Sequence, residues 1–196
     1  MSVFHGMQNR KEGPMPPELA NAALLRKLRI VLGVFMLALV LSGLTAFPLE
    51  RELSMVCSAR GIEQLHPSDV HNGLDSWLLT VRDGLGEMYA KHPWIAYGTD
   101  WLAFAHIIIA IFFIGAYVNP VRNVWVLEAG LVACALVVPL ALICGHIRQI
   151  PLGWRLIDCS FGVVGAVPLW ICLRWARELE RSGHPQSPCG TNAVAP

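Results

Sequence analysis

The most regular feature of the sequence is a set of four apolar runs, each near the roughly 20 residues needed to cross a hydrocarbon core. They extend over about residues 30–47, 101–118, 124–145 and 156–173. Polar and apolar residues do not alternate within these runs, as they would in the strands of a membrane barrel. The pattern predicts an all-α fold, a polytopic membrane protein built as a bundle of four transmembrane helices.

A different pattern occupies the segment between the first two runs, residues 48–97. Apolar residues recur at spacings of three and four over about residues 70–90, and acidic residues lie on the opposite side. We expect an extracytoplasmic amphipathic helix that lies on the membrane surface or caps the bundle. A helix that binds a partner would show the same pattern, so this alternative stays open.

Composition supports the membrane interpretation. Hydrophobic residue types make up 55% of the 196 residues and charged types 15%, against roughly 25% charged in an ordinary soluble domain. The mean hydropathy is +0.50. These values disfavour a soluble enzyme, and the net charge of +1 gives no basic surplus for nucleic acid.

The few charges are unevenly placed. Lysine and arginine gather in both terminal flanks, so the positive-inside rule predicts cytoplasmic termini, although Arg148 and Arg155 then lie on the outer side. We expect the protein to be a multi-pass protein of the plasma membrane. Tryptophans near both sets of span ends fit interfacial anchors.

We expect residues 1–28 to be a partly disordered cytoplasmic segment, residues 29–175 the membrane domain, and residues 176–196 a disordered cytoplasmic tail.

Small residues within two of the runs indicate close helix packing. Ala129 and Ala133 in the third run, and Gly162 and Ala166 in the fourth, form small-xxx-small pairs. Such pairs allow helix backbones to approach closely in a membrane. They favour a packed bundle over isolated spans.

Ionisable residues in or beside the apolar runs are costly to insert, so each needs a partner or a purpose. Helix rise, counted from the predicted outer ends, places six polar residues in the outer leaflet: Asp100, His106, His146, Arg148, Arg155 and Asp158. Arginine suits a carbonyl, carboxylate or phosphate group, and a His–Asp pair suits proton transfer to a quinone or similar lipophile. We therefore interpret this set as a candidate ligand-binding site.

Structural roles compete with that interpretation. Arg155 and Asp158 are three residues apart on one predicted helix face, which favours a local ion pair. Asp100 suits the N-cap of the second span. His106 needs a hydrogen-bond partner among apolar neighbours, which Asp158 or a backbone carbonyl would supply, so a satisfied buried histidine and a ligand contact are both open.

On the inner side, Glu128 lies a short way into the third run, where we expect an ion pair with Arg122 or, as an alternative, Arg174. Haem is disfavoured because His106 lies inside the predicted core and His146 at its rim. The remaining histidines match no zinc pattern, and no metal site is expected.

The six cysteines contain no C-x-x-C motif. A disulfide from Cys57 to Cys144 or Cys159 is conceivable in an oxidising compartment, but free buried thiols are favoured.

No nucleotide loop, nucleophile elbow or metalloprotease motif is present in the sequence. We therefore expect an accessory or structural subunit of a larger membrane complex, with a possible outer-leaflet site for a quinone or other lipophile. Its partners would be the lipid bilayer and other membrane-protein subunits, not nucleic acid. The alternative is a membrane-embedded redox or quinone-reactive enzyme that uses His106, Asp158 and Arg155.

Overall fold

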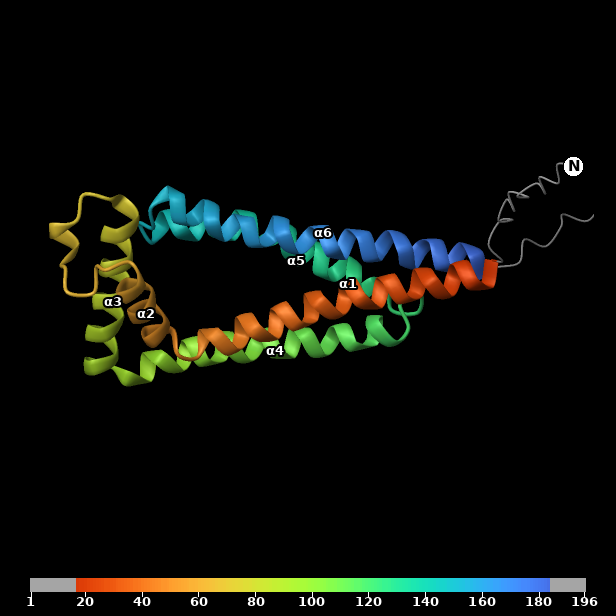
Figure 1. The fold of residues 1–196 in the computed structure, drawn as a ribbon, viewed down its shortest axis with the longest axis horizontal. Helices are drawn as coiled ribbons and strands as arrows, with labels where there is room; N and C mark the ends of the chain where they lie inside the picture. The colour runs from red at the N-terminus through yellow and green to blue at the C-terminus, as the bar shows by residue number, and fades with distance from the viewer. Residues whose placement is uncertain (1–16, 184–196) are drawn as a thin grey trace, which may run out of the picture. The chain divides into compact units, whose positions relative to one another are not determined.

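The computed structural model describes residues 17–183, which fold into six α-helices and two single-turn 3-10 helices (Figure 1). In chain order these are α1 (Pro17–Ala46), α2 (Leu49–Ala59), η1 (Pro67–Asp69), α3 (Gly73–Lys91), η2 (Pro93–Ile95), α4 (Ala96–Val118), α5 (Val124–Ile147) and α6 (Leu152–Gly183). The predicted all-α fold is confirmed.

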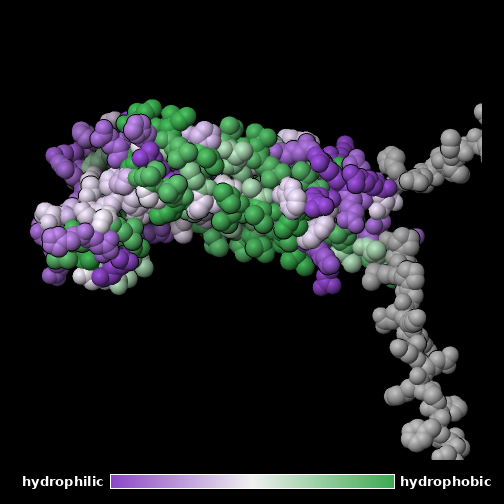
Figure 2. Space-filling view, turned by 90° about the horizontal axis from the view of Figure 1, so that it is seen from above, coloured by the Kyte–Doolittle hydropathy of each residue, from purple (hydrophilic) through white to green (hydrophobic). Residues whose placement is uncertain are grey.

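Four of these helices, α1, α4, α5 and α6, are long and apolar enough to cross a membrane. Each coincides with one of the four predicted runs. Only 11–22% of the residues in their most apolar windows are buried within the protein, so most of their apolar surface faces outward. On the face seen in Figure 2, hydrophobic residues cover the middle of the long helices and hydrophilic residues gather towards the ends. This is the surface expected of a multi-pass membrane protein.

The first and last spans in the sequence, α1 and α6, extend beyond their apolar runs. α1 begins at Pro17 and α6 continues to Gly183, so the predicted boundaries after residues 28 and 175 fall inside helices. The added turns are rich in leucine, alanine, arginine and glutamate, which favour helix even where they are polar. The predicted disorder of the first and last residues lies outside the described part of the chain, in residues 1–16 and 184–196.

The chain divides into two compact units, and the boundary falls within α1. Unit 1 comprises residues 1–31 and 119–196, and unit 2 comprises residues 32–118. Each unit has its own core and its own candidate residues.

In unit 1, α5 and α6 form an antiparallel hairpin with a short connection (Figure 1). Gln149 takes a left-handed conformation with φ 60° just after α5. Its amide donates to the carbonyl of His146 at 3.0 Å, and the amide of Ile150 donates to the carbonyl of Gly145 at 2.9 Å. This pair of hydrogen bonds is a Schellman motif, which ends α5 and turns the chain back into α6.

Glycine allows the two helices of this hairpin to approach closely. A Cβ atom added to Gly162 would lie 2.5 Å from the carbonyl oxygen of Cys134 on α5. The close helix packing predicted for the pair Gly162 and Ala166 is therefore confirmed for Gly162. The first half of α1 joins the same unit, because the Cys172 thiol lies 3.8 Å from the Leu28 carbonyl oxygen and both residues are buried.

In unit 2, the second half of α1 packs against α4. A Cβ atom added to Gly43 would lie 2.7 Å from the carbonyl oxygen of Ala103. The rings of Phe35 and Phe113 meet edge to face, with centroids 5.2 Å apart. The contact between α1 and α4 therefore includes a small residue, Gly43, and an aromatic pair, Phe35 and Phe113.

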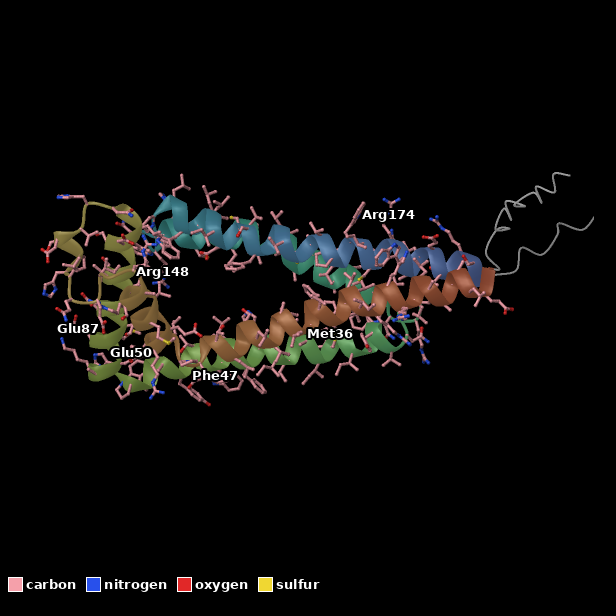
Figure 3. The ribbon with its side chains drawn as sticks, in the orientation of Figure 1. Met36, Phe47, Glu50, Glu87, Arg148 and Arg174 are labelled. Carbon is pink, nitrogen blue, oxygen red and sulfur yellow. The ribbon has the colours of Figure 1, made fainter. Side chains whose placement is uncertain are left out.

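The predicted amphipathic helix, about residues 70–90, is confirmed as α3. The side chain of Asn72 caps its start by accepting a hydrogen bond from the Leu74 amide at 3.1 Å. Near its end, Lys91 donates to Glu87 at 2.6 Å, and the hydrogen bond and charge of Lys91 hold the pKa of the Glu87 carboxyl below its ordinary value. Figure 3 labels Glu87 in this segment.

Helix α2 was not among the predicted elements. It begins directly after Pro48 and packs against α3, where Arg60 at its C-cap pairs with Asp75 at 2.5 Å. Cys57 is its fully buried residue. The segment between α1 and α4 therefore contains two α-helices, α2 and α3, that contact each other.

Candidate functional site

The six polar residues predicted to share the outer leaflet belong to both units. Asp100 and His106 lie on α4 in unit 2, whereas the other four, His146, Arg148, Arg155 and Asp158, lie on α5, α6 or their connection in unit 1. Their assembly into one site stays a prediction. The contacts within each unit nevertheless show what each side chain does locally.

Arg155 lies in the first turns of α6 and folds back over α5. A Cβ atom added to Gly145 would lie 2.6 Å from both Cγ and Cδ of Arg155, so the arginine stem occupies the space that the glycine leaves. Its Nη1 approaches the carbonyl oxygen of Leu142 at 3.5 Å, and its buried Nε has no hydrogen-bond partner. The ion pair predicted with Asp158 is absent from those recorded for residues 17–183. Because Gly145 has no side chain, the side chain of Arg155 packs against α5 instead of turning towards Asp158.

The other three residues of the hairpin end lie around this arginine in the sequence. His146 is exposed in the last turn of α5, where a cation would interact favourably with the helix dipole. Arg148 is the C-cap residue of α5, and its amide donates to Cys144 at 2.9 Å (labelled in Figure 3). Asp158 is half-buried on α6.

His106 has a partner within its own helix. Its Nδ1 lies 2.8 Å from the carbonyl oxygen of Leu102, and because a carbonyl only accepts, Nδ1 carries the hydrogen and Nε2 is left as an acceptor in the neutral ring. Its Cβ also faces Gly43 at the α1–α4 contact. The sequence left two roles for His106, a buried histidine with a hydrogen-bond partner in the protein or a histidine that contacts a ligand. The structure provides the hydrogen-bond partner of the first role, the Leu102 carbonyl.

Asp100 is not a helix cap. α4 begins at Ala96, so Asp100 lies inside the helix, and the Thr99 hydroxyl donates to the Ala96 carbonyl at 2.7 Å. Asp100 instead borders an open groove of about 320 Å³ whose other lining residues are all aromatic: Phe47, Tyr97, Trp101 and Phe104. A carboxylate beside aromatic rings suits an amphiphile whose polar group is cationic or donates hydrogen bonds.

At the opposite end of unit 1, Glu128 does have an ionic partner, but it is neither Arg122 nor Arg174. Arg177 Nη2 lies 2.8 Å from Glu128 Oε1, and both side chains are about half exposed, 52% and 47%. The Arg122 amide is bonded to Asn119 Oδ1 at 3.1 Å. Arg177 reaches Glu128 because the antiparallel hairpin brings the end of α6 beside the start of α5, a long-range contact that sequence spacing did not reveal.

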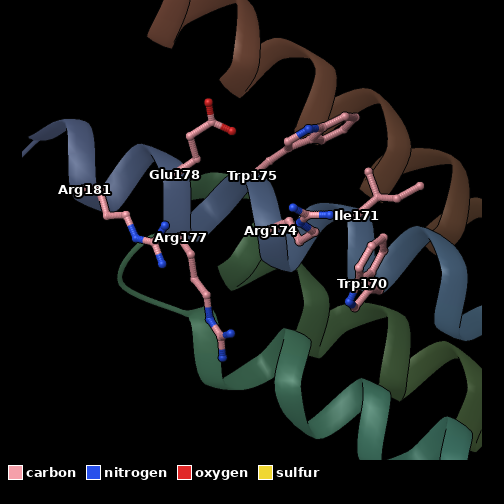
Figure 4. Close-up of a pocket in the computed structure, with 7 residues that line it drawn as sticks. All are labelled: Trp170, Ile171, Arg174, Trp175, Arg177, Glu178 and Arg181. Atoms are coloured by element: carbon pink, nitrogen blue, oxygen red, sulfur yellow. The ribbon is translucent and has the colours of Figure 1, made fainter.

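Sequence reasoning missed a second groove, which borders this ion pair. Figure 4 shows its lining residues, all from α6, and its volume is about 800 Å³. They are Trp170, Ile171, Arg174, Trp175, Arg177, Glu178 and Arg181. The available signal was the spacing of the arginines with Trp170 on a single helix face. The sequence analysis interpreted these arginines as orientation signals, and Arg174 also as an alternative partner of Glu128. We refer to Arg174, Arg177 and Arg181 as the arginine stripe.

Five of the six cysteines lie within the residues that the structure describes. Cys57, Cys134, Cys144, Cys159 and Cys172 are free thiols in the structure. Within residues 17–183, no group of three or more His, Cys, Asp or Glu side chains is placed to hold a metal ion.

No protein-family model, no curated protein and no solved structure matches this chain. Its function is therefore inferred from the residues and contacts above.

Proposed function

We propose that the protein is an accessory or structural subunit of a larger membrane complex. The observation that carries this proposal is an exposed stripe along α5 that begins with two small residues. Ala129 and Ala133 are exposed, and the stripe continues at helical spacing through Leu136 and Leu140 to Ile143, each of these three about 60% exposed.

Small residues have a particular meaning on such a surface. Lipid chains pack equally well against leucine and alanine, so a lipid-facing helix has no need of small side chains. A second helix does need them, because they allow backbones to approach within van der Waals contact. In this chain the Gly162 contact uses a small residue within the hairpin, whereas Ala129 and Ala133 face away from it. They supply a contact surface for a helix of another subunit.

The test compares two alanines on the same helix. Ala133→Phe places a large ring on the stripe, whereas Ala135→Phe places the same ring on an exposed position about 200° away around α5. After mild detergent extraction from native membranes, native mass spectrometry measures the mass of the assembly. We expect Ala133→Phe to release the partner and Ala135→Phe to retain it. A wild-type protein that is monomeric, or equal retention in both variants, would contradict the proposal.

A lipophile site at the hairpin end is the second part of the proposal. It is supported by the buried Arg155 Nε, which lacks a partner and would be satisfied by a carbonyl or phosphate oxygen of a bound lipophile. His146, Arg148 and Asp158 lie nearby in the sequence. Mass spectrometry of lipophiles retained by the wild type and by Arg155→Gln tests this site, with loss of a retained species in the variant as the expected result.

The same preparation addresses the alternative, a membrane-embedded redox or quinone-reactive enzyme. That function would use His106, Asp158 and Arg155, and it predicts a quinone or chromophore in the absorption spectrum. A stable protein partner with a featureless visible spectrum favours the subunit. A bound quinone whose reduction is lost in His106→Gln favours the enzyme.

We also propose that both termini lie in the cytoplasm and that the protein resides in the plasma membrane. Four candidate spans within residues 17–183 support one side of the membrane for both ends of this segment, and the basic residues in the first half of α1 and near the end of α6 favour the cytoplasmic side. Reporter fusions at each terminus test this orientation. Activity of an extracytoplasmic reporter at either terminus would contradict it.

A further inference from the structure

One face of α6 changes from apolar to basic along its length. Its exposed residues include Leu156, Val163 and Val167 in the first two-thirds of the helix, each 54–61% exposed. Trp170, 52% exposed, follows on the same face. The arginine stripe then continues this face at spacings of four, three and four residues from Trp170, so that tryptophan and arginines extend over about 16 Å of helix.

Two of the three arginines in the arginine stripe are held by contacts before any ligand binds. The guanidinium carbon of Arg174 lies 4.9 Å from the centroid of the Trp170 ring, a cation–π distance. Arg177 is fixed by its 2.8 Å contact with Glu128. Figure 4 shows Trp170, Arg174 and Arg177 along the groove. Part of the entropy cost of gathering the guanidinium groups around an anion is therefore already met by the fold.

The charge balance of this groove favours an anion. Three arginines and one acidic residue, Glu178, line it, and Glu128 offsets the charge of Arg177. The start of α1 brings further positive charge to the same level of unit 1, because Leu28 contacts Cys172. Arg26 and Lys27, which precede Leu28, are exposed.

We propose that this face of α6 binds one anionic phospholipid. The phosphate and a negatively charged headgroup contact Arg174 and Arg181, and Trp170 lies at the level of the glycerol backbone. An acyl chain extends along Val167 and Val163. The continuity of apolar, aromatic and basic residues on one helix face matches the order of these groups in a phospholipid, and a free phosphate would leave the apolar part uncovered. This inference does not depend on the proposed subunit function.

The experiment uses the full chain in detergent, titrated with phosphatidylglycerol or with phosphatidylcholine and read by native mass spectrometry. The wild type should bind phosphatidylglycerol in preference to phosphatidylcholine. The double variant Arg174→Gln, Arg181→Gln should lose about fivefold in phosphatidylglycerol affinity for each arginine removed. Arg51→Gln is the matched control, since it removes an exposed arginine of α2, outside the four candidate spans and outside the binding sites proposed above, and it should leave the affinity within about twofold of wild type.

A second variant separates binding from folding. Arg174→Lys, Arg181→Lys keeps both charges and should retain most of the affinity, so a loss in the glutamine variant alone, with unchanged circular dichroism, assigns the effect to charge. A competition experiment with inorganic phosphate distinguishes binding of the phospholipid from binding of free phosphate. Full displacement of the lipid by millimolar phosphate would overturn the lipid proposal, as would equal binding of the two lipids or an equal effect of Arg51→Gln.

Discussion

The two ends of the α5–α6 hairpin use arginine in opposite ways. At the connection, the stem of Arg155 fills the space beside Gly145 and its Nε is buried. At the other end, Arg174 lies over an exposed tryptophan and Arg177 pairs with Glu128 at a half-exposed position. The same residue type therefore serves packing at one end and forms an accessible basic surface at the other.

The contrast follows from what each arginine meets on its neighbours. A glycine allows a long side chain to lie flat against a helix, where its methylene groups are buried and its charge is costly. A tryptophan and a glutamate hold the guanidinium at the surface, where an ion pair contributes little stability but the group stays open to ligands. Substitutions near Arg155 should thus affect stability, and substitutions in the arginine stripe should affect binding.

The largest effect on the packed part of the hairpin is expected at Gly162. Even a methyl group there would lie 2.5 Å from the backbone oxygen of Cys134, and backbone cannot move aside as a side chain can. Gly162→Ala should lower the free energy of unfolding by about 1–3 kcal/mol. Gly153→Ala is the control, because a Cβ atom at Gly153 meets nothing within 4 Å. Denaturant titration of both variants in detergent measures the difference, and equal stabilities would show that the helices do not approach closely.

A smaller effect is expected at Gly145. There a new Cβ meets the stem of Arg155 rather than backbone, and the stem moves at a modest cost of about 1 kcal/mol. A double-mutant cycle with Arg155→Ala isolates the contact. Gly145→Ala should cost stability in the wild-type background and nothing in the Arg155→Ala background. The same loss in both backgrounds would mean that Arg155 does not occupy the space beside Gly145.

The smallest effect is expected from the ion pair at the basic end. Glu128→Gln removes the partner of Arg177, but both side chains are about half exposed, so the loss should be at most about 1 kcal/mol. Urea titrations of Glu128→Gln, Arg177→Gln and the double variant give the coupling energy. A coupling energy well above about 1 kcal/mol would mean that the Glu128–Arg177 pair is shielded from solvent. The basic end of the hairpin would then resemble the packed end at Arg155.

The sequence predicts spans and the amphipathic helix well, because apolar run length and periodicity are properties of neighbouring residues. It failed where contacts join distant residues. Arg155 was assigned to Asp158, its neighbour on the helix, whereas Gly145 on α5 determines its path. Glu128 was assigned to Arg122 or Arg174, whereas the hairpin pairs it with Arg177.

Helix ends were the second source of error. α4 begins earlier than its apolar run, at Ala96, which removes Asp100 from the cap position. α2 was missed because it has only 11 residues, of mixed polarity, and depends on its contact with α3. The groove on α6 was overlooked for a different reason, since its arginines already had an explanation as orientation signals.

The most direct test of the contrast between the two ends is a paired measurement on Gly145→Ala, beside Arg155, and Arg174→Gln. For each variant, the free energy of unfolding and the affinity for phosphatidylglycerol are determined in the same detergent. We expect Gly145→Ala to lose stability and keep its phosphatidylglycerol affinity, and Arg174→Gln to keep stability and lose about fivefold in affinity. If both variants lose the same property, the two ends do not differ in the way described.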